Sequence, residues 1–164
     1  MATNFFLALD SITGESTDTG HPGQIQVLSW SHSFNQPTSP TRSSAGSGTV
    51  EQANHADFSI TKYIDSATDD LLKACWSGKQ IATGTFTAYR SDGTGNGVNY
   101  LEIDFANVVV SNYSISGGTG DVPVETVTLS YSKVTYKYIP QKQADGTGGA
   151  AQPVTHDLAG QSVS

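Results

Sequence analysis

Four histidines are the side chains in this sequence best suited to metal binding or proton transfer. His21, His55 and His156 stand in segments without strand or helix patterns, and His32 stands in a predicted strand. No two of them have the His-x-His or His-x3-His spacing of a metal site, and a single cysteine, Cys75, is too few for a structural zinc site. We therefore expect solvated loop histidines, no metal and no bound cofactor.

Serine and carboxylate side chains offer two further kinds of chemistry. No Gly-x-Ser-x-Gly elbow positions a nucleophilic serine, and no Gly-x4-Gly-Lys-Ser/Thr run forms a phosphate-binding loop. Glu102 and Asp104 share one face of a predicted strand, about 6.6 Å apart at Cα, a separation that could suit a glycosidase. A solvated outer face explains such a pair more simply. We predict no catalytic residues and no enzymatic activity.

Trp30 and Trp76 could serve either the core or the binding of a sugar, depending on whether they are buried. We expect both to anchor the core. Exposed, they could instead stack on sugars, as in a monomeric carbohydrate-binding β-sandwich. Cys75 lies on an apolar helical stripe and is expected to be a core residue.

Composition and charge exclude several classes of protein. The chain has 164 residues, with 20 Ser, 19 Thr and 17 Gly, which favours strands and turns over helices. Eight basic residues face fifteen acidic ones, for a net charge of −7 without a Lys/Arg cluster, so we expect no nucleic-acid partner. No apolar run approaches the ~20 residues that span a bilayer, so no membrane insertion is expected. Met1–Asp10 lacks a basic region, so no Sec-type signal peptide is predicted.

Period-2 alternation predicts most of the elements. Strands are expected at 4–10, 24–34, 56–64, 79–90, 98–111 with a continuation at 112–116, and 122–139. In 24–34 one parity holds Leu28, Trp30 and Phe34, predicted to face the core. The other holds Ser29, Ser31 and Ser33, predicted to face water or a partner. In 98–111, Leu101, Ile103, Phe105 and Val109 are expected to face one way. A parity switch between Tyr131 and Val134 predicts a bulge or a corner where the strand changes sheets.

One helix is predicted, at about 66–76. Asp65 or Ser66 can cap its first turn, where Asp69 and Asp70 also suit the helix dipole. An apolar stripe that includes Leu71 follows, and Gly78 is a suitable stop residue.

A long segment, 35–55, has no pattern and contains two prolines and two glycines. A structureless connection of about 20 residues inside a compact domain usually signals function or disorder. We predict a protruding arm that contacts a neighbouring subunit. The residues expected in that interface are Gln36, Pro37, Pro40, Arg42, Val50 and Glu51.

These elements predict an all-β fold: a small β-barrel of two sheets, with one flanking helix and one long loop. Residues 1–146 form the expected domain. Residues 147–164 form a Gly/Ala/Ser-rich C-terminal tail that is expected to be mobile or to dock late.

A series of short motifs resembles one known family. The motifs are Gly14-Glu15-Ser16 with Asp18 and His21, Ile25-x-Val27-Leu28-x-Trp30-Ser31, Phe58-Ser59-Ile60-Thr61-Lys62-Tyr63-Ile64-Asp65, Leu71-Leu72-x-Ala74-Cys75 with Ser77-Gly78-Lys79, Glu125-x-Val127-x-Leu129, and Tyr138-x-Pro140-Gln141-Lys142-x-x-Asp145-Gly146. Together, in this order and spacing, they resemble haemolysin-coregulated protein (Hcp), the tube subunit of type VI secretion systems. The resemblance runs from residue 5 to about 146. This chain's arm is Ser/Thr/Pro-rich where some family arms are Gly-rich and contain Met.

The resemblance implies a structural role. Six copies would form a ring, and rings would stack into a tube that sheath contraction expels, with effector proteins carried or chaperoned in the lumen. Partners would be other copies, then sheath, spike and effectors. The protein would leave the bacterial cytoplasm through the apparatus without a cleaved signal peptide. Ser29, Ser31 and Ser33 are our candidates for the lumen wall.

Two other classes stay open at the level of sequence. A phage-type tail tube protein would share the architecture in another machine, and a carbohydrate-binding β-sandwich would stay monomeric.

Overall fold

The computed structural model describes residues 3–37, 52–91, 97–142 and 148–164, and strands dominate them. The first sheet has the order β12-β11-β10-β8-β7-β1-β2, and the second has the order β3-β6-β9-β8. The strands are β1 (Thr3–Leu9), β2 (Ile25–Val27), β3 (Ser29–Ser31), β4 (Phe34–Asn35), β5 (Asn54–His55), β6 (Phe58–Tyr63), β7 (Ile81–Ser91), β8 (Gly97–Ser116), β9 (Val124–Ser130), β10 (Lys133–Tyr138), β11 (Gln152–Asp157) and β12 (Ser162–Val163).

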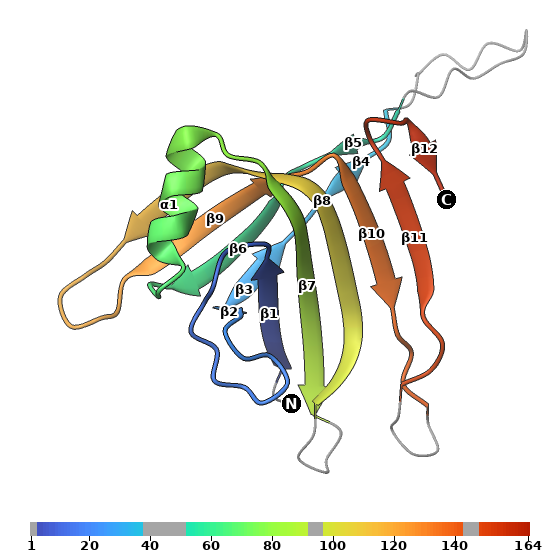
Figure 1. Cartoon of the computed structure of the whole chain (residues 1–164). Helices are drawn as coiled ribbons and strands as arrows, with labels where there is room; N and C mark the ends of the chain where they lie inside the picture. Colours follow the sequence, from blue (N-terminus) through green and yellow to red (C-terminus); the bar gives the residue numbers. More distant parts are fainter. Residues whose placement is uncertain (1–2, 38–51, 92–96, 143–147) are drawn as a thin grey trace, which may run out of the picture.

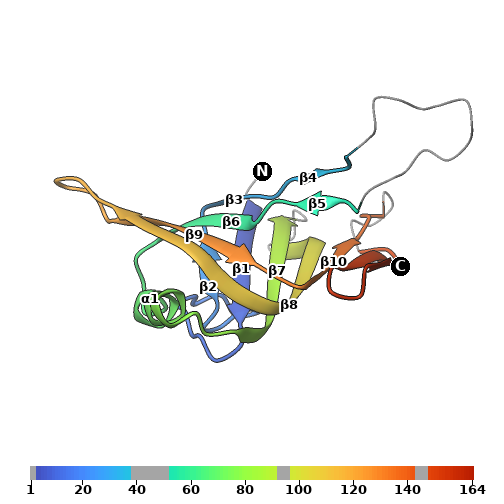
Figure 2. The same ribbon diagram turned by 90° about the horizontal axis from the view of Figure 1, so that it is seen from above.

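The long strand β8 belongs to both sheets (Figures 1 and 2). It pairs with β7 and β10 in its first half and with β9 from Val109 to Ser116. The all-β class, the two sheets and the flanking helix are confirmed. The sheets enclose one core, but no ladder among the described strands closes them into a continuous barrel.

Alternation along β8 shifts where the strand passes between the sheets. Asn107 has a positive φ of 54°, and beyond it Val108 and Val110 are buried, whereas Val109 is only half-buried. The prediction that Val109 shares the inward face of Phe105 is therefore wrong. A local change of backbone direction resets the period of two.

The chain also passes from one sheet to the other between consecutive strands. β9 lies in the second sheet and β10 in the first, with Tyr131 between them, which confirms the predicted corner. The same happens between β2 and β3, where the Leu28 N–H donates to the Thr61 carbonyl at 2.7 Å. Leu28 is 42% exposed as a result, and Phe34 is 49% exposed. The predicted inward face of 24–34 is thus wrong for both, and of the three only Trp30 packs against the core.

The core lies between the sheets and under helix α1 (Thr68–Ser77). Phe58, Phe86, Ile103 and Leu129 are fully buried, and Leu71 of the helix packs on them. Burial of such side chains contributes about 1.5–3 kcal/mol each.

Helix α1 begins two residues later than predicted, and its capping differs. Ala67 precedes it and offers no side-chain cap, and the Asp65 carboxylate accepts from the Ala67 N–H at 3.0 Å. Gly78 ends the helix with φ 65°, as predicted. Trp76 is 80% exposed, so the prediction that it anchors the core is wrong. In the part of the chain that the structure describes, no helix has the length and apolar character needed to cross a membrane.

The ends of the pattern-free segment pair with each other. Phe34 lies opposite His55 and Asn35 opposite Asn54, which forms a short β4–β5 ribbon. The tail residues also form strands: β11 pairs with β10 along its length, and β12 pairs with β11. The sequence predicted little order there.

Candidate functional site

The outer face of the second sheet carries small uncharged polar side chains. Ser29 and Ser31 of β3 lie opposite Thr61 and Ser59 of β6. Cross-strand partners share a face, so pairing extends the row across β9 and β8 to complete what we call the hydroxyl face: Ser29, Ser31, Ser59, Thr61, Thr126, Thr128, Ser114 and Asn112.

All eight side chains of the hydroxyl face are exposed or half-exposed, and none carries a charge. The Ser59 and Thr128 hydroxyls lie 3.5 Å apart, which fits their common side. Asp57, one residue before β6, accepts a hydrogen bond from Ser111 at the end of this face. The structure therefore places Ser29 and Ser31 together on a neutral, hydrogen-bonding surface.

Ser33 lies apart from that surface. β3 ends at Ser31, and Ser33 is exposed in the link to β4, with its carbonyl accepting from the Ala56 N–H at 2.9 Å.

Only two of the six residues predicted for the arm interface lie within the described part of the chain. Gln36 is exposed and Pro37 half-buried just beyond β4. Pro40, Arg42, Val50 and Glu51 lie outside the described residues.

Three of the four histidines meet beside the β4–β5 ribbon: His32, predicted to lie in a strand, and His55 and His156, predicted to be solvated loop residues. His32 Nδ1 lies 2.5 Å from the Tyr136 hydroxyl, and His32 Nε2 lies 2.6 Å from the Tyr131 hydroxyl. The same Tyr131 hydroxyl lies 2.7 Å from His55 Nδ1, and His55 Nε2 lies 2.7 Å from His156 Nδ1. We call these five residues the histidine–tyrosine cluster. The prediction of solvated loop histidines is wrong for His55 and His156, because folding brings distant segments together.

Burial disfavours the charged forms of four of the five residues in this cluster. Burial, with a smaller effect from the charge of His55, lowers the pKa of His32 to about 4. Burial and then the charge of His156 lower the pKa of His55. Burial also raises the pKa of Tyr131 and of Tyr136 above the ordinary tyrosine value. These pKa shifts hold His32, His55 and the two tyrosines in their uncharged forms at neutral pH.

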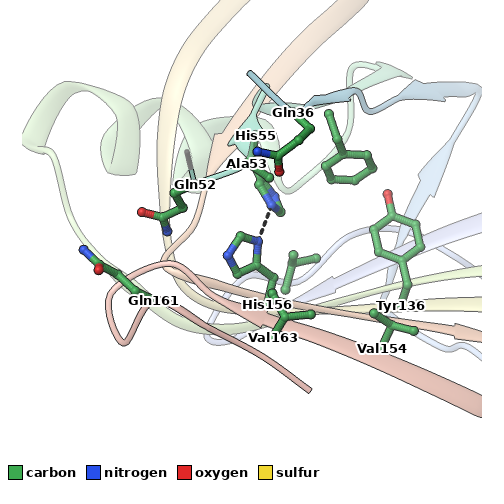
Figure 3. A pocket seen from close by; sticks show the side chains of 11 residues that line it. Gln36, Gln52, Ala53, His55, Tyr136, Val154, His156, Gln161 and Val163 are labelled. Carbon is green, nitrogen blue, oxygen red and sulfur yellow. Dashed lines mark hydrogen bonds between the residues drawn. The ribbon is translucent and has the colours of Figure 1, made fainter. Parts of the chain in front are cut away.

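A cavity of about 610 Å³ lies between the β4–β5 ribbon and strands β10 to β12 (Figure 3). His55 and His156 point toward each other at its wall, and Tyr136, Val154 and Val163 supply apolar surface. No Asp, Glu, Lys or Arg is among the described residues that line it.

The fourth histidine sits in an arrangement that superficially suggests catalysis. Asp18 Oδ2 lies 2.8 Å from His21 Nδ1, and His21 Nε2 lies 2.7 Å from the Tyr89 hydroxyl. Burial, with the nearby charges of Glu102 and Asp18, raises the pKa of Tyr89. A tyrosine made less acidic is a poor nucleophile or general acid, so this trio holds its loop against β7.

The carboxylate pair weighed as a glycosidase site is occupied by an ion pair. Lys137 Nζ lies 2.9 Å from Glu102 and 2.7 Å from Asp104. Both carboxylates therefore pair with the same lysine ammonium group on the outer face of the first sheet. Among the described residues, no group of three or more His, Cys, Asp or Glu is arranged to hold a metal ion.

Sequence motifs that are far apart in the chain also converge at the start of α1. Lys62 is fully buried, with Nζ 2.6 Å from Glu125 and 2.8 Å from Asp65. The Thr68 hydroxyl donates to Glu125 at 2.9 Å. This buried ion network ties β6 and β9 to the helix.

The described residues thus define a two-sheet β protein with one flanking helix and an outer face of uncharged polar side chains. The family model described as "Type VI secretion system effector, Hcp" matches residues 6–138. The chain therefore belongs to the Hcp family of type VI secretion proteins, secreted structural proteins that act as tube and effector components.

Individual relatives agree with this assignment. "Protein hcp1" of Pseudomonas aeruginosa is 40% identical over 147 residues, covering 89% of this chain and 88% of that protein. A crystal structure of Hcp1 from Salmonella typhimurium is 30% identical with a TM-score of 0.80, covering 100% of both chains. A structure titled as a type six secretion system protein has a TM-score of 0.89 at 28% identity, covering 99% of this chain and 100% of the other.

Proposed function

We propose that six copies of this protein form a ring, that rings stack into a tube, and that the hydroxyl face lines the lumen. The observation that carries the proposal is that all eight side chains of that face are uncharged, with the carboxylate of Asp57 only at its end. A wall of serine and threonine hydroxyls stays wetted while offering no fixed charge to trap a passing protein. The alternative of a phage-type tube is set aside because the family is one of type VI secretion.

Ring closure has a physical route in the second sheet. In the described residues, β3 pairs only with β6, and the Val109–Ser116 part of β8 pairs only with β9. Both edges of the sheet therefore offer backbone groups to another chain. Two different edges that meet repeatedly form a heterologous contact, which generates a closed ring when the rotation fits.

The arm is the second proposed contact. Gln36, Pro37, Pro40, Arg42, Val50 and Glu51 would lie against the adjacent subunit. The β4–β5 ribbon supports this role because it sets the direction in which the chain leaves the domain.

We also propose the remaining features of a tube subunit for this chain. Its partners would be sheath, spike and effector proteins, with effectors carried in the lumen. It would leave the bacterial cytoplasm through the apparatus without a cleaved signal peptide, and it would have no catalytic activity.

Light scattering on a size-exclusion peak, with negative-stain images of the same fraction, tests the ring. We expect ring-shaped particles with a mass near 103 kDa, six times 17.2 kDa. Deletion of residues 38–50 should release monomers. A single species near 17.2 kDa at high concentration would contradict a ring that forms unaided.

Gold labelling tests the assignment of the lumen. Ser31→Cys in a Cys75→Ser background, labelled with maleimide-gold, should show density inside the ring. Trp76→Cys in the same background is the matched control, because Trp76 is exposed on the helix, and its label should appear on the outside. Gold at the outer rim for Ser31→Cys would show that the hydroxyl face does not line the lumen.

A further inference from the structure

The histidine–tyrosine cluster joins residues from segments that lie far apart in the chain. His32 precedes β4 and His55 lies in β5, so one histidine stands at each strand of the β4–β5 ribbon from which the arm extends. Tyr131 and Tyr136 come from the β9–β10 corner and β10, and His156 comes from β11. The cluster therefore fastens the β4–β5 ribbon to strands β10 and β11 of the first sheet.

Counting protons shows how the fastening depends on protonation. A neutral histidine has one ring N–H and one acceptor nitrogen. All four contacts are satisfied when donation runs in one direction: Tyr136 hydroxyl to His32, His32 to Tyr131, Tyr131 hydroxyl to His55, and His55 to His156. Each histidine is then uncharged and carries its proton on Nε2.

A single added proton can still be accommodated, because the tyrosine hydroxyls rotate and the chain of donors can run in either direction. A second proton breaks the order. When His55 and His156 are both protonated, the Nε2–H of His55 and the Nδ1–H of His156 face each other as two donors at 2.7 Å. Two protonated histidines also repel, because His32 and His55 ring centroids lie 6.4 Å apart, and those of His55 and His156 4.7 Å apart.

Few charges surround the cluster to offset this. Asp57 precedes β6 and slightly favours the charged form of His32. On β10 and β11, Lys133 and Asp157 are cross-strand partners, and the Asp157 carboxylate accepts from the Gly160 N–H. The facing residues of β4, Phe34 and Asn35, are uncharged, and Phe34 stacks edge-on against His55 and Tyr136.

We propose that the histidine–tyrosine cluster is an acid-sensitive clasp, which holds the β4–β5 ribbon on β10 and β11 at neutral pH and releases it when its histidines are protonated. The release is a property of the folded chain. Its consequence, loosening of the arm and weakening of the ring, rests on the proposed function.

The direction of the effect follows from burial. A histidine whose folded pKa lies below 6.5 stabilises the closed form fully at higher pH. That contribution is lost as pH falls from 6.5 toward the folded pKa, which is about 4 for His32. At about pH 5.5, one unit below the ordinary histidine pKa, one such histidine raises the ratio of open to closed form about tenfold over its value at neutral pH.

Hydrogen–deuterium exchange on the full chain tests the clasp directly. We expect peptides covering 28–37 and 52–60 to exchange about tenfold faster at about pH 5.5 than at about pH 7.5, after correction for the chemical exchange rate. Peptides from β1 and β7 should not change. Equal corrected rates for the ribbon peptides at both pH values would overturn the proposal.

Three variants make the test specific. The triple variant His32→Asn, His55→Gln, His156→Asn cannot be protonated and should lose the acid response. Tyr131→Phe removes the central hydroxyl but keeps the ring, so its ribbon should already exchange fast at neutral pH. His21→Gln, a histidine outside the cluster, is the control and should keep the wild-type acid response. An unchanged acid response in the triple variant, or wild-type protection at neutral pH in Tyr131→Phe, would contradict the clasp.

Light scattering on the same samples separates the two proposals. A monomer at neutral pH that still shows the acid response would contradict the unaided ring and support the clasp. A ring at neutral pH whose ribbon shows no acid response would support the unaided ring and contradict the clasp.

Discussion

The two sheets of this protein place their charges on opposite sides. In the first sheet the inner face is apolar, and the outer face carries Lys137 with Glu102 and Asp104. In the second sheet the charges, Lys62 and Glu125, are buried on the inner side, and the outer hydroxyl face is neutral. Strand β8 runs through both sheets, so the two sheets belong to one domain. The side on which the charged residues lie therefore differs between two sheets of the same domain.

This inversion shows what each face is suited for. Surface charges on the first sheet suit a solvated exterior. In the second sheet, the buried pair connects β6 and β9 to α1, where Thr68 and Asp65 complete its hydrogen bonds. A buried ion pair is costly to break and adds little net stability over an apolar pair. We therefore infer that the buried pair serves to orient helix α1. Because both charges point inward, they add none to the outer face.

The largest expected effect comes from breaking the buried pair. Lys62→Met should lower the free energy of unfolding by about 3–5 kcal/mol, because Glu125 is left buried without its partner. Urea unfolding followed by circular dichroism measures this. The double variant Lys62→Met, Glu125→Leu should recover most of the loss. A single-variant loss below about 1 kcal/mol would place the pair in a wetter environment than the structure shows.

The equivalent change on the first sheet should matter much less. Lys137→Met should cost about 1 kcal/mol or less, because the Lys137 pair is about one-third exposed and solvent screens it. Repeating the unfolding measurement in about 1 M NaCl should shrink the cost further, since salt screens exposed charges. A loss as large as that of Lys62→Met would abolish the contrast between the two sheets.

Adding a charge to the hydroxyl face should have a still smaller effect on the fold. Ser31→Lys should change the free energy of unfolding by about 0.5 kcal/mol or less, because Ser31 is exposed. If the face is an open lumen wall, the variant should keep a ring mass near 103 kDa, six times 17.2 kDa. Light scattering that finds only monomers would instead mean that Ser31 lies in a subunit interface.

The weakest predicted effect concerns the stacking of rings. Six copies at −7 give a ring charge of −42, so stacked rings repel unless their faces are complementary. We expect stacking in solution to be weak and to increase between about 0.05 and 0.5 M NaCl, as the Debye length shortens. Sedimentation velocity measures it. Stacking that is indifferent to ionic strength would refute the charge argument.

Much of the fold was predictable because its signals are local. Alternation marked the strands, Gly78 marked the helix end, and the parity change after Tyr131 marked the sheet corner. The serine parity of Ser29 and Ser31 marked an exposed face, and the same alternation in Ser59 and Thr61 or Thr126 and Thr128 would have extended it.

Other features were not predictable because they depend on which segments meet. The inward assignments of Leu28 and Val109 failed where a strand leaves one sheet for the other, since a period of two does not survive a change of backbone direction. Trp76 was assigned to the core from its type, although the helix turns it to solvent.

By itself, the sequence determined the strand-rich class, the helix, the family resemblance and the polarity of individual strand faces. These follow from side-chain type at short spacing, which each element expresses locally. Only the tertiary structure decided that His32, His55 and His156 share one hydrogen-bonded cluster and that Lys62 meets Glu125 inside the core. Such contacts join residues far apart in the chain, and their partners are set by how the two sheets pack.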